Sequence, residues 1–307
     1  MWHYAFKRLL SAIPTMFVIV TLAFFMMRLA PGGPFDKERA LPPEIEQNIL
    51  AAYDLDKPLW YQYLKYLGGL LQGDFGPSYR IRDFSVSELI AQGFPASLQL
   101  GATAMIIAVA VGVSLGTVAA LRQNSKVDYA VMTVAMTGIA LPNFVIAPLL
   151  TLVFGVYLSW LPVAGWGEGA IANKILPVIA LALPQVAYIA RMTRGSMVEV
   201  LNANYIRTAR AKGLSERLVV VRHAIKGALL PVVSYLGPAT AAIITGSVVV
   251  ETIFSIPGIG RYFVLGALNR DYTLVLGVMV FYAVLIILLN LAVDLIYGLL
   301  DPKVRQH

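Results

Sequence analysis

Residues 273–300 read TLVLGVMVFYAVLIILLNLAVDLIYGLL, and Asp294 is the one charged residue among them. A helix of roughly 20 apolar residues is long enough to cross the hydrocarbon core of a bilayer, which is about 30 Å thick. The composition of the whole chain agrees, because 58% of its 307 residues are hydrophobic and 13% are charged. Soluble domains carry roughly 25% charged residues. The sequence therefore predicts an all-α integral membrane protein.

Five further segments meet the same criterion of length and hydropathy, so we predict six transmembrane helices. Besides Thr273–Leu300, the predicted spans are Leu9–Leu29, Ala96–Leu121, Ala130–Trp160, Ile175–Ala190 and Gly227–Phe254. The first segment follows two basic residues, as a signal peptide would. Its apolar stretch of about 20 residues nevertheless exceeds the roughly 7–15 residues of a cleaved signal. We therefore expect it to remain as the first span.

The distribution of charge predicts the orientation of the spans. The N-terminal segment, residues 122–129, residues 191–226 and the C-terminal tail together carry fourteen basic and four acidic residues, a net +10. Loop 31–95 carries six basic and nine acidic residues, a net −3. Basic residues gather on the cytoplasmic side of membrane proteins. We therefore expect both termini in the cytoplasm and loop 31–95 outside, and we read the basic charge as facing membrane lipid and partner proteins, with no nucleic acid.

Three parts follow from this topology. Residues 1–30 form the N-terminal tail and first span, residues 31–95 an external loop, and residues 96–307 a five-helix core that contains the cytoplasmic loop 191–226. Loop 31–95 opens with a turn cluster at 31–34 and is predicted to hold two amphipathic helices, one beginning at Pro42–Pro43 and one running from Pro58 to Leu71. Their aromatic faces suit either a small cap packed on the ends of the spans or a docking surface for an external soluble partner.

Prolines punctuate three of the predicted spans, namely the third at Pro142 and Pro148, the fourth at Pro177 and Pro184, and the fifth at Pro231 and Pro238. Each proline removes a backbone hydrogen bond and tends to kink its helix. In a membrane the freed carbonyls need neighbours or a water-lined cavity. These spans are therefore candidates for a transport path, although proline is also common in ordinary membrane helices. We expect Pro184 to interrupt the short fourth span.

Two acidic residues lie inside predicted spans, where a charge is costly and usually pairs or lines a pathway. Asp294 is expected to pair with a cation such as Arg191 or Arg194 and so to fix helix packing. Glu251, near the outer end of the fifth span, is expected to cap or brace the glycine-rich turn at 255–260. We interpret both as structural intramembrane charges.

The most distinctive polar segment is residues 205–213, YIRTARAKG, which lies in the predicted cytoplasmic loop. Its basic side chains are predicted to lie on the outer face of a helix, and a glycine after basic residues, here Gly213, is typical of a helix C-terminus. Ser215 is predicted to cap a second helix that contains Leu218, Val219, Arg222 and Ile225. Anionic lipid would explain the cations, but it would not explain the small residues, the glycine and the later proline at Pro231. We therefore predict a docking site for a partner.

With these motifs in place, the chain resembles the permease subunits of binding-protein-dependent ABC importers. Residues 205–231 are similar to the family's cytoplasmic coupling loop, with Arg207-Thr208-Ala209 in the position of the general Glu-Ala-Ala. Leu230-Pro231 lies further from Gly213 than in the general pattern, and the peptide and nickel branch shares both departures. Other strings similar to that branch, and most of all to its oligopeptide members in Gram-negative bacteria, are RLLSAIPT at 8–15, FMMRLAPG at 25–32, GDFGPSY at 73–79, RGSMVE at 194–199, GSVVVETIFSIPGIG at 246–260 and NRDY at 269–272.

The resemblance implies a multi-pass permease subunit of the bacterial inner membrane that moves oligopeptides from periplasm to cytoplasm. It implies as partners a second homologous permease, two ATPase subunits, a periplasmic peptide-binding protein and the peptide substrate. ATP and Mg would bind to the ATPase subunits, and no cofactor would bind to this chain. The chain agrees, because it has no phosphate loop of the form G-x-x-x-x-G-K followed by Ser or Thr. We therefore expect a transport subunit and no enzyme.

The resemblance also assigns roles to residues. The ATPase-coupling residues would be Tyr205, Arg207, Thr208, Ala209, Arg210, Lys212 and Gly213. Candidates for the translocation path are Pro142, Asn143, Thr245, Gly246 and Ser247. No metal site and no catalytic residue are expected.

Other functions remain to be weighed. A dipeptide or nickel importer permease is the nearest alternative within the family. An ion-driven secondary transporter predicts internal repeats and charges at the membrane midplane, and the sequence displays neither. An intramembrane protease would need a buried Ser/His pair or two intramembrane aspartates. The histidines, His3, His223 and His307, lie outside the predicted spans, and Asp294 is the one aspartate within them. The absence of cysteine excludes disulfides, thiolate metal sites and cysteine nucleophiles.

Overall fold

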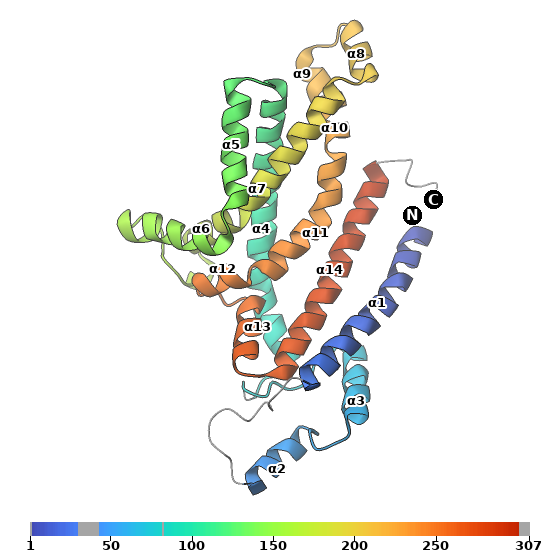
Figure 1. Ribbon diagram of the computed structural model, residues 1–307, viewed down its shortest axis with the longest axis vertical. Coiled ribbons are helices and arrows are strands. Elements are labelled where there is room, and N and C mark those ends of the chain that lie inside the picture. Colours follow the sequence, from blue (N-terminus) through green and yellow to red (C-terminus); the bar gives the residue numbers. More distant parts are fainter. Residues whose placement is uncertain (1, 30–42, 82, 301–307) are drawn as a thin grey trace. The chain divides into compact units, whose positions relative to one another are not determined.

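The computed structural model describes residues 2–29, 43–81 and 83–300, and within them the regular structure is helical (Figure 1). The predicted turn at 31–34 and the C-terminal tail lie outside the described residues. Five helices are long and apolar enough to cross a membrane, and a bent pair of helices makes a sixth span if it is counted as one. The expected all-α membrane fold with six spans is consistent with this arrangement.

The long helices are α1 (Trp2–Leu29), α4 (Val86–Leu121), α7 (Ile171–Leu201) and α14 (Tyr272–Leu300). The fifth span is α11 (Leu230–Gly246) followed by α12 (Val248–Ile253), with Ser247 between them. The bent pair is α5 (Lys126–Ala140) and α6 (Asn143–Leu150), the latter extended by the π-helical turn η1 (Thr151–Tyr157). A short 3-10 turn, η2 (Gly167–Gly169), precedes α7.

The expected interruption of the third span, 130–160, is confirmed at Pro142, where α5 and the α6–η1 segment meet at an angle of 104°. The interruption expected at Pro148 is wrong, because Pro148 lies inside α6. The break falls at Leu141, which is extended (φ −89°, ψ 118°). The ring of the following Pro142 disfavours helical backbone at the residue before it. Helix α6 then begins at Asn143.

The predicted interruption of the fourth span at Pro184 is also wrong, because α7 runs unbroken through Pro177 and Pro184 for 31 residues. Neighbouring helices can support backbone groups that a proline leaves without a partner, and α7 packs against α5, α6, α11 and α12. The helix also extends beyond the predicted span to Leu201, so the first third of the predicted cytoplasmic loop is helical.

One compact unit comprises the described parts of residues 1–8, 97–256 and 285–307, and α7, which contacts α5, α6, α10, α11 and α12, is its central helix. Helix α4 approaches α7 through two glycines, and Figure 1 shows α4 and α5 beside α7. A Cβ atom on Gly116 would lie 2.4 Å from the carbonyl oxygen of Ala190 and 2.7 Å from Cβ of Thr193. The absence of a side chain at Gly116 is therefore what allows the two helices to pack so closely.

The second compact unit comprises Leu9–Ala96 and Pro257–Val284. It holds the two helices predicted in the external loop, which are confirmed as α2 (Pro43–Ala52) and α3 (Leu59–Leu71), together with α13 (Ile259–Leu268). The aromatic face of α3 packs on α1, where the ring centroids of Phe24 and Tyr63 are 5.3 Å apart. The hydroxyls of Thr21 and Tyr63 are 2.6 Å apart. Helix α3 thus packs on α1, and the two readings of the loop, as a cap on the ends of the spans or as a docking surface, stay predictions.

Candidate functional site

The predicted docking segment is a short helix, a glycine turn and a second helix. Helix α8 (Asn204–Ala211) is followed by Lys212, Gly213 and Leu214. The second helix begins after Ser215 as α9 (Glu216–Leu218) and continues through the π-helical turn η3 (Val219–Ala224) into α10 (Ile225–Ala228). This arrangement confirms both predicted helices, although Leu201 ends α7 and does not share a helix with Tyr205. Figure 1 shows α8 and α9 beyond the end of α7.

One face of α8 is fixed by hydrophobic packing. Ile206 is fully buried and Ala209 is 7% exposed, and the two lie three residues apart on one face of the helix. They pack in a cluster with Met197 of α7 and with the second helix. Ala209, which the resemblance assigned to the coupling residues, thus contacts this chain's own core. Because the cluster joins α7, α8 and the second helix, these three elements hold one another in place.

The opposite face of α8 is exposed and carries most of the predicted coupling residues. Its exposed side chains are those of Tyr205, Arg207, Thr208, Arg210 and Lys212, and Gly213 is exposed beside them. Arg207 has no ion-pair partner among the residues that the structure describes. The exposed face of α8 is therefore basic and polar, with one aromatic ring. The opposite face of the same helix is fixed by hydrophobic packing.

Gly213 makes the turn between the two helices. Its φ is +79°, a conformation that glycine adopts without strain and other residues rarely adopt. Its backbone N–H donates to the carbonyl of Arg210 at 2.9 Å, and the N–H of Lys212 donates to Thr208 at 3.0 Å. The glycine predicted from the sequence as a helix stop is confirmed in that role.

Arg210 spans this turn to reach Glu216. Its Nε donates to Oε2 of Glu216 at 3.1 Å, and a terminal nitrogen donates to Oε1 at 2.6 Å. This hydrogen-bonded pair lowers the pKa of Glu216 and raises that of Arg210. Glu216 was not predicted as a site residue. Residues six apart are not neighbours on one helix, and Arg210 and Glu216 meet only because the chain turns at Gly213. Arg210 thus shapes the motif as well as charging its surface.

Arg210→Glu is expected to reduce severalfold the transport activity that the sequence predicts. The free energy of unfolding should barely change, since exposed ion pairs contribute little to folding. Two carboxylates would then repel each other across the Gly213 turn. The exchanged pair, Arg210→Glu with Glu216→Arg, is expected to restore most of the loss, measured as transport in cells at matched protein levels. Arg217→Glu is the matched control for charge. If the exchanged pair fails to recover, Arg210 itself contacts the partner.

A second ion pair joins the start of α5 to α7. Arg194 donates from Nε to Oδ1 of Asp128 at 2.6 Å and from a terminal nitrogen to Oδ2 at 2.7 Å. Asp128 is only 1% exposed and also accepts from the N–H of Asn124. Arg194 was predicted as one partner for Asp294. That residue lies on α14, but its side chain is outside what the structure describes, so its pairing stays a prediction.

The five predicted path residues lie at the two helix breaks. Pro142 precedes α6 and Asn143 is its first residue, and Asn143 Oδ1 is buried without a hydrogen-bond partner among the described residues. Thr245, Gly246 and Ser247 stand at the junction of α11 and α12. The short helices that follow the breaks, α6 and α12, pack against each other and against α7. The structure thus brings together two segments that are about 100 residues apart in the sequence.

Glu251 lies at the centre of a buried polar cluster in α12. It is fully buried, and its Oε1 lies 2.7 Å from Oγ of Ser97 and 2.6 Å from Oγ of Ser247. The backbone carbonyl of Glu251 accepts from the N–H of Ile256, whereas its carboxylate is turned to Ser97 and Ser247, so the expectation that its charge braces the following turn stays a prediction. Ser97, on α4, was missed because nothing local marks it. Among the described residues, no group of three or more His, Asp or Glu side chains is placed to hold a metal ion.

Comparison with known proteins places this geometry in context. The profile of the family described as "Binding-protein-dependent transport system inner membrane component" matches residues 112–306. The oligopeptide transport system permease protein OppB of Escherichia coli is 56% identical over 305 residues, which cover 99% of this chain and 100% of that protein. The dipeptide transport system permease protein DppB of Bacillus subtilis is 47% identical over 307 residues, covering 100% and 99%.

Among solved structures, an inward-facing conformation of the MetNI methionine ABC transporter shares the fold. Its TM-score is 0.60 at 17% identity, and the match covers 70% of this chain and 97% of that chain. At this level of identity the likeness concerns the fold alone.

Proposed function

Because this chain belongs to the family of binding-protein-dependent transport system inner membrane components, we propose that it is the permease subunit of an ATP-driven ABC importer for oligopeptides. The observation that carries the substrate is the 56% identity to an oligopeptide permease along the full chain. The 47% identity to a dipeptide permease favours dipeptides less. On this proposal the chain hydrolyses no ATP, and separate subunits supply the energy.

The exposed face of α8 is the proposed contact with an ATPase subunit. Arg207, Thr208 and Lys212 present donors and charge, and Tyr205 adds an aromatic ring beside them. The buried pair Ile206 and Ala209 prevents α8 from moving independently of α7 and the second helix. A push on α8 would therefore be passed through α10 to α11 and through Met197 to α7.

The helix breaks are the proposed elements of the translocation path. Irregular backbone at membrane depth is tolerated where it is buried in protein or lines a water-filled cavity. Both breaks adjoin α7, which also carries the cluster that holds α8. On this proposal α7 links the ATPase contact to Pro142, Asn143 and Ser247. The partners are a second permease, two ATPases and a periplasmic binding protein, with both termini cytoplasmic in the inner membrane.

Reconstitution tests the function directly. Proteoliposomes that contain this chain, the second permease, both ATPases and the binding protein are expected to accumulate a radiolabelled tetrapeptide when ATP is present. Omitting any subunit is expected to reduce accumulation to background, and the purified chain alone is expected to hydrolyse no ATP. A preference for dipeptides over tetrapeptides would shift the assignment to the dipeptide importers. Uptake driven by an ion gradient without the ATPases would overturn the proposal.

A further inference from the structure

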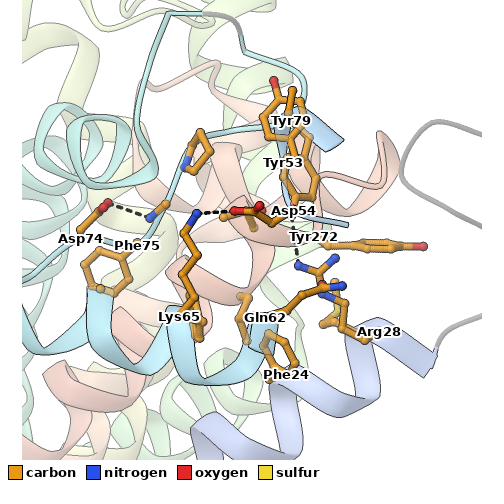
Figure 2. Close-up of a pocket in the computed structure, with 18 residues that line it drawn as sticks. Phe24, Arg28, Tyr53, Asp54, Gln62, Lys65, Asp74, Phe75, Tyr79 and Tyr272 are labelled. Atoms are coloured by element: carbon orange, nitrogen blue, oxygen red, sulfur yellow. Dashed lines mark hydrogen bonds and ion pairs between the residues drawn. The ribbon is translucent and has the colours of Figure 1, made fainter. Parts of the chain in front are cut away.

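A cavity of about 270 Å3 lies inside the unit that contains α2 and α3. Its walls come from α1, α3, the start of α14, and the segments at 52–54 and 74–79 (Figure 2). None of its lining residues belongs to α8 or to the two helix breaks, so the proposed transport function leaves it unexplained. Pockets for small ligands begin at roughly 300 Å3, so a cavity of this size suits a ligand comparable to one amino acid.

Two polar groups in this cavity lack the hydrogen bonds that buried polar atoms normally make. The side chain of Gln62 is 9% exposed, and its Nε2 donates to the carbonyls of Leu55 at 3.3 Å and Lys57 at 2.8 Å. Those two acceptors fix the orientation of the amide. Among the described residues, its Oε1 is therefore an acceptor without a donor, and the hydroxyl of Tyr66 is also buried without a partner. Burial raises the pKa of Tyr66, so the hydroxyl remains a neutral donor.

The cavity is lined by charged residues of both signs. Arg28 donates to the hydroxyl of Tyr79 at 3.1 Å and lies 5.4 Å from the ring centroid of Phe24, and it has no acidic partner among the described residues. Lys65 is paired with Asp54. Asp74 accepts from the N–H of Gly76 at 2.8 Å. In Figure 2, Arg28 and Asp74 stand on opposite sides of the cavity, with the Lys65–Asp54 pair between them.

We propose that this cavity binds a small zwitterion of amino-acid size, with its carboxylate on Arg28 and its ammonium group toward Gln62 Oε1. The four charged residues sum to zero, as a zwitterion requires. Guanidinium groups bind carboxylates with strong charge-assisted hydrogen bonds. The ammonium group supplies the donor that Gln62 lacks, and the hydroxyl of Tyr66 supplies a further donor to the ligand. An apolar or aromatic ligand side chain would pack against Phe24, Phe75 and the tyrosine rings.

The geometry of α1 disfavours a phospholipid as the occupant. Phe24, Met27 and Arg28 line the cavity, whereas Leu22, Met26 and Leu29 are 58%, 71% and 72% exposed. At 3.6 residues per turn, those three exposed residues lie roughly 140–160° around the helix from Phe24. A lipid whose acyl chains cover the exposed face would have to wrap around α1 to place its headgroup in the cavity. The ligand is therefore water-borne.

Equilibrium binding to the purified full-length chain tests the site, using tritiated L-phenylalanine as the probe. We expect saturable binding with one site per chain. N-acetyl-L-phenylalanine lacks the ammonium group and L-phenylalaninamide lacks the carboxylate, so both are expected to compete at least about tenfold less well. No saturable binding, or equal competition by L-phenylalaninamide, would overturn the proposal. Binding needs no transport, so its outcome is separable from that of the proposed function.

Variants locate the binding within the structure. Arg28→Gln is expected to weaken binding by about tenfold or more, because it removes a charged hydrogen bond. Tyr66→Phe is expected to weaken it about fivefold, and folding should be spared because that hydroxyl has no partner. Arg261→Gln, an exposed cation on α13 in the same unit, is the matched control and should bind as the unaltered chain does. Equal binding by all three variants would overturn the site, as would a tightly held phospholipid that Arg28→Gln releases.

Discussion

Gly213→Pro is expected to abolish peptide uptake while membrane insertion remains intact. Gly213 adopts φ +79° and donates its N–H to the carbonyl of Arg210. Proline fixes φ near −65° and has no N–H, so neither feature can survive and the second helix must leave α8 along a different direction. Glu216 would then be carried away from Arg210. Uptake of a radiolabelled peptide, normalised to the amount of chain in the membrane, measures the effect.

Among substitutions of Gly213, peptide uptake should fall in the order in which the new residues tolerate a positive φ. Asparagine visits this region readily and is expected to retain most uptake, whereas the β-branched side chain of Gly213→Val is expected to lose nearly as much as proline. No atom lies near a Cβ at this position, so the ranking reports backbone conformation and not crowding. Gly195→Ala, at a helical and equally open glycine, serves as the control. Normal uptake by Gly213→Pro would refute the coupling role of the turn.

Gly116→Leu is expected to prevent stable folding of the chain. Even the first carbon of a side chain would lie 2.4 Å from the carbonyl oxygen of Ala190, well inside van der Waals contact. Overpacking of a tight interior costs about 1–3 kcal/mol or more, and here the obstructing atom belongs to rigid helix backbone. Helix α4 would have to separate from α7, the central helix of its unit. The yield and melting temperature of the purified membrane protein measure the loss.

A matched glycine on α5 provides the contrast. At Gly138 a Cβ would meet its nearest atoms at 3.4 Å, an ordinary contact with Ala187 and Leu183 of the same helix α7. Gly138→Ala is therefore expected to fold with little change, and Gly116→Ala to be destabilised by about 1–3 kcal/mol. Similar melting temperatures for these two alanine variants would show that α4 and α7 can separate without cost.

The spans and the helices of loop 31–95 could be predicted because their signals are local. Apolar length marks α1, α4 and α14, and proline at the start followed by aromatic spacing marks α3. The effect of proline could not be predicted in the same way. Pro142 accompanies a 104° bend, whereas Pro177 and Pro184 lie inside an unbroken helix. Whether a proline breaks a helix depends on the helices packed around it, which no local pattern records.

In the candidate site, too, local features could be predicted and long-range contacts could not. Gly213 was predictable, since a helix stop after basic residues is written in consecutive residues. The partners of charged groups were not. Ser97 lies 154 residues from Glu251, and Asp128 lies 66 residues from Arg194. These contacts exist because α4, α5, α7 and α12 pack together. Ala209 was predicted as a coupling residue, and its burial likewise depends on the packing of the second helix against α8.

The unbroken course of α7 has a consequence for where the docking surface stands. Eleven residues follow the last apolar stretch of this helix, from Arg191 to Leu201. At 1.5 Å per residue they extend about 16 Å. On the proposed orientation this extension of α7 places α8 beyond the lipid headgroups. An ATPase could therefore engage α8 without touching the bilayer, and uptake should be indifferent to the charge of the inner leaflet.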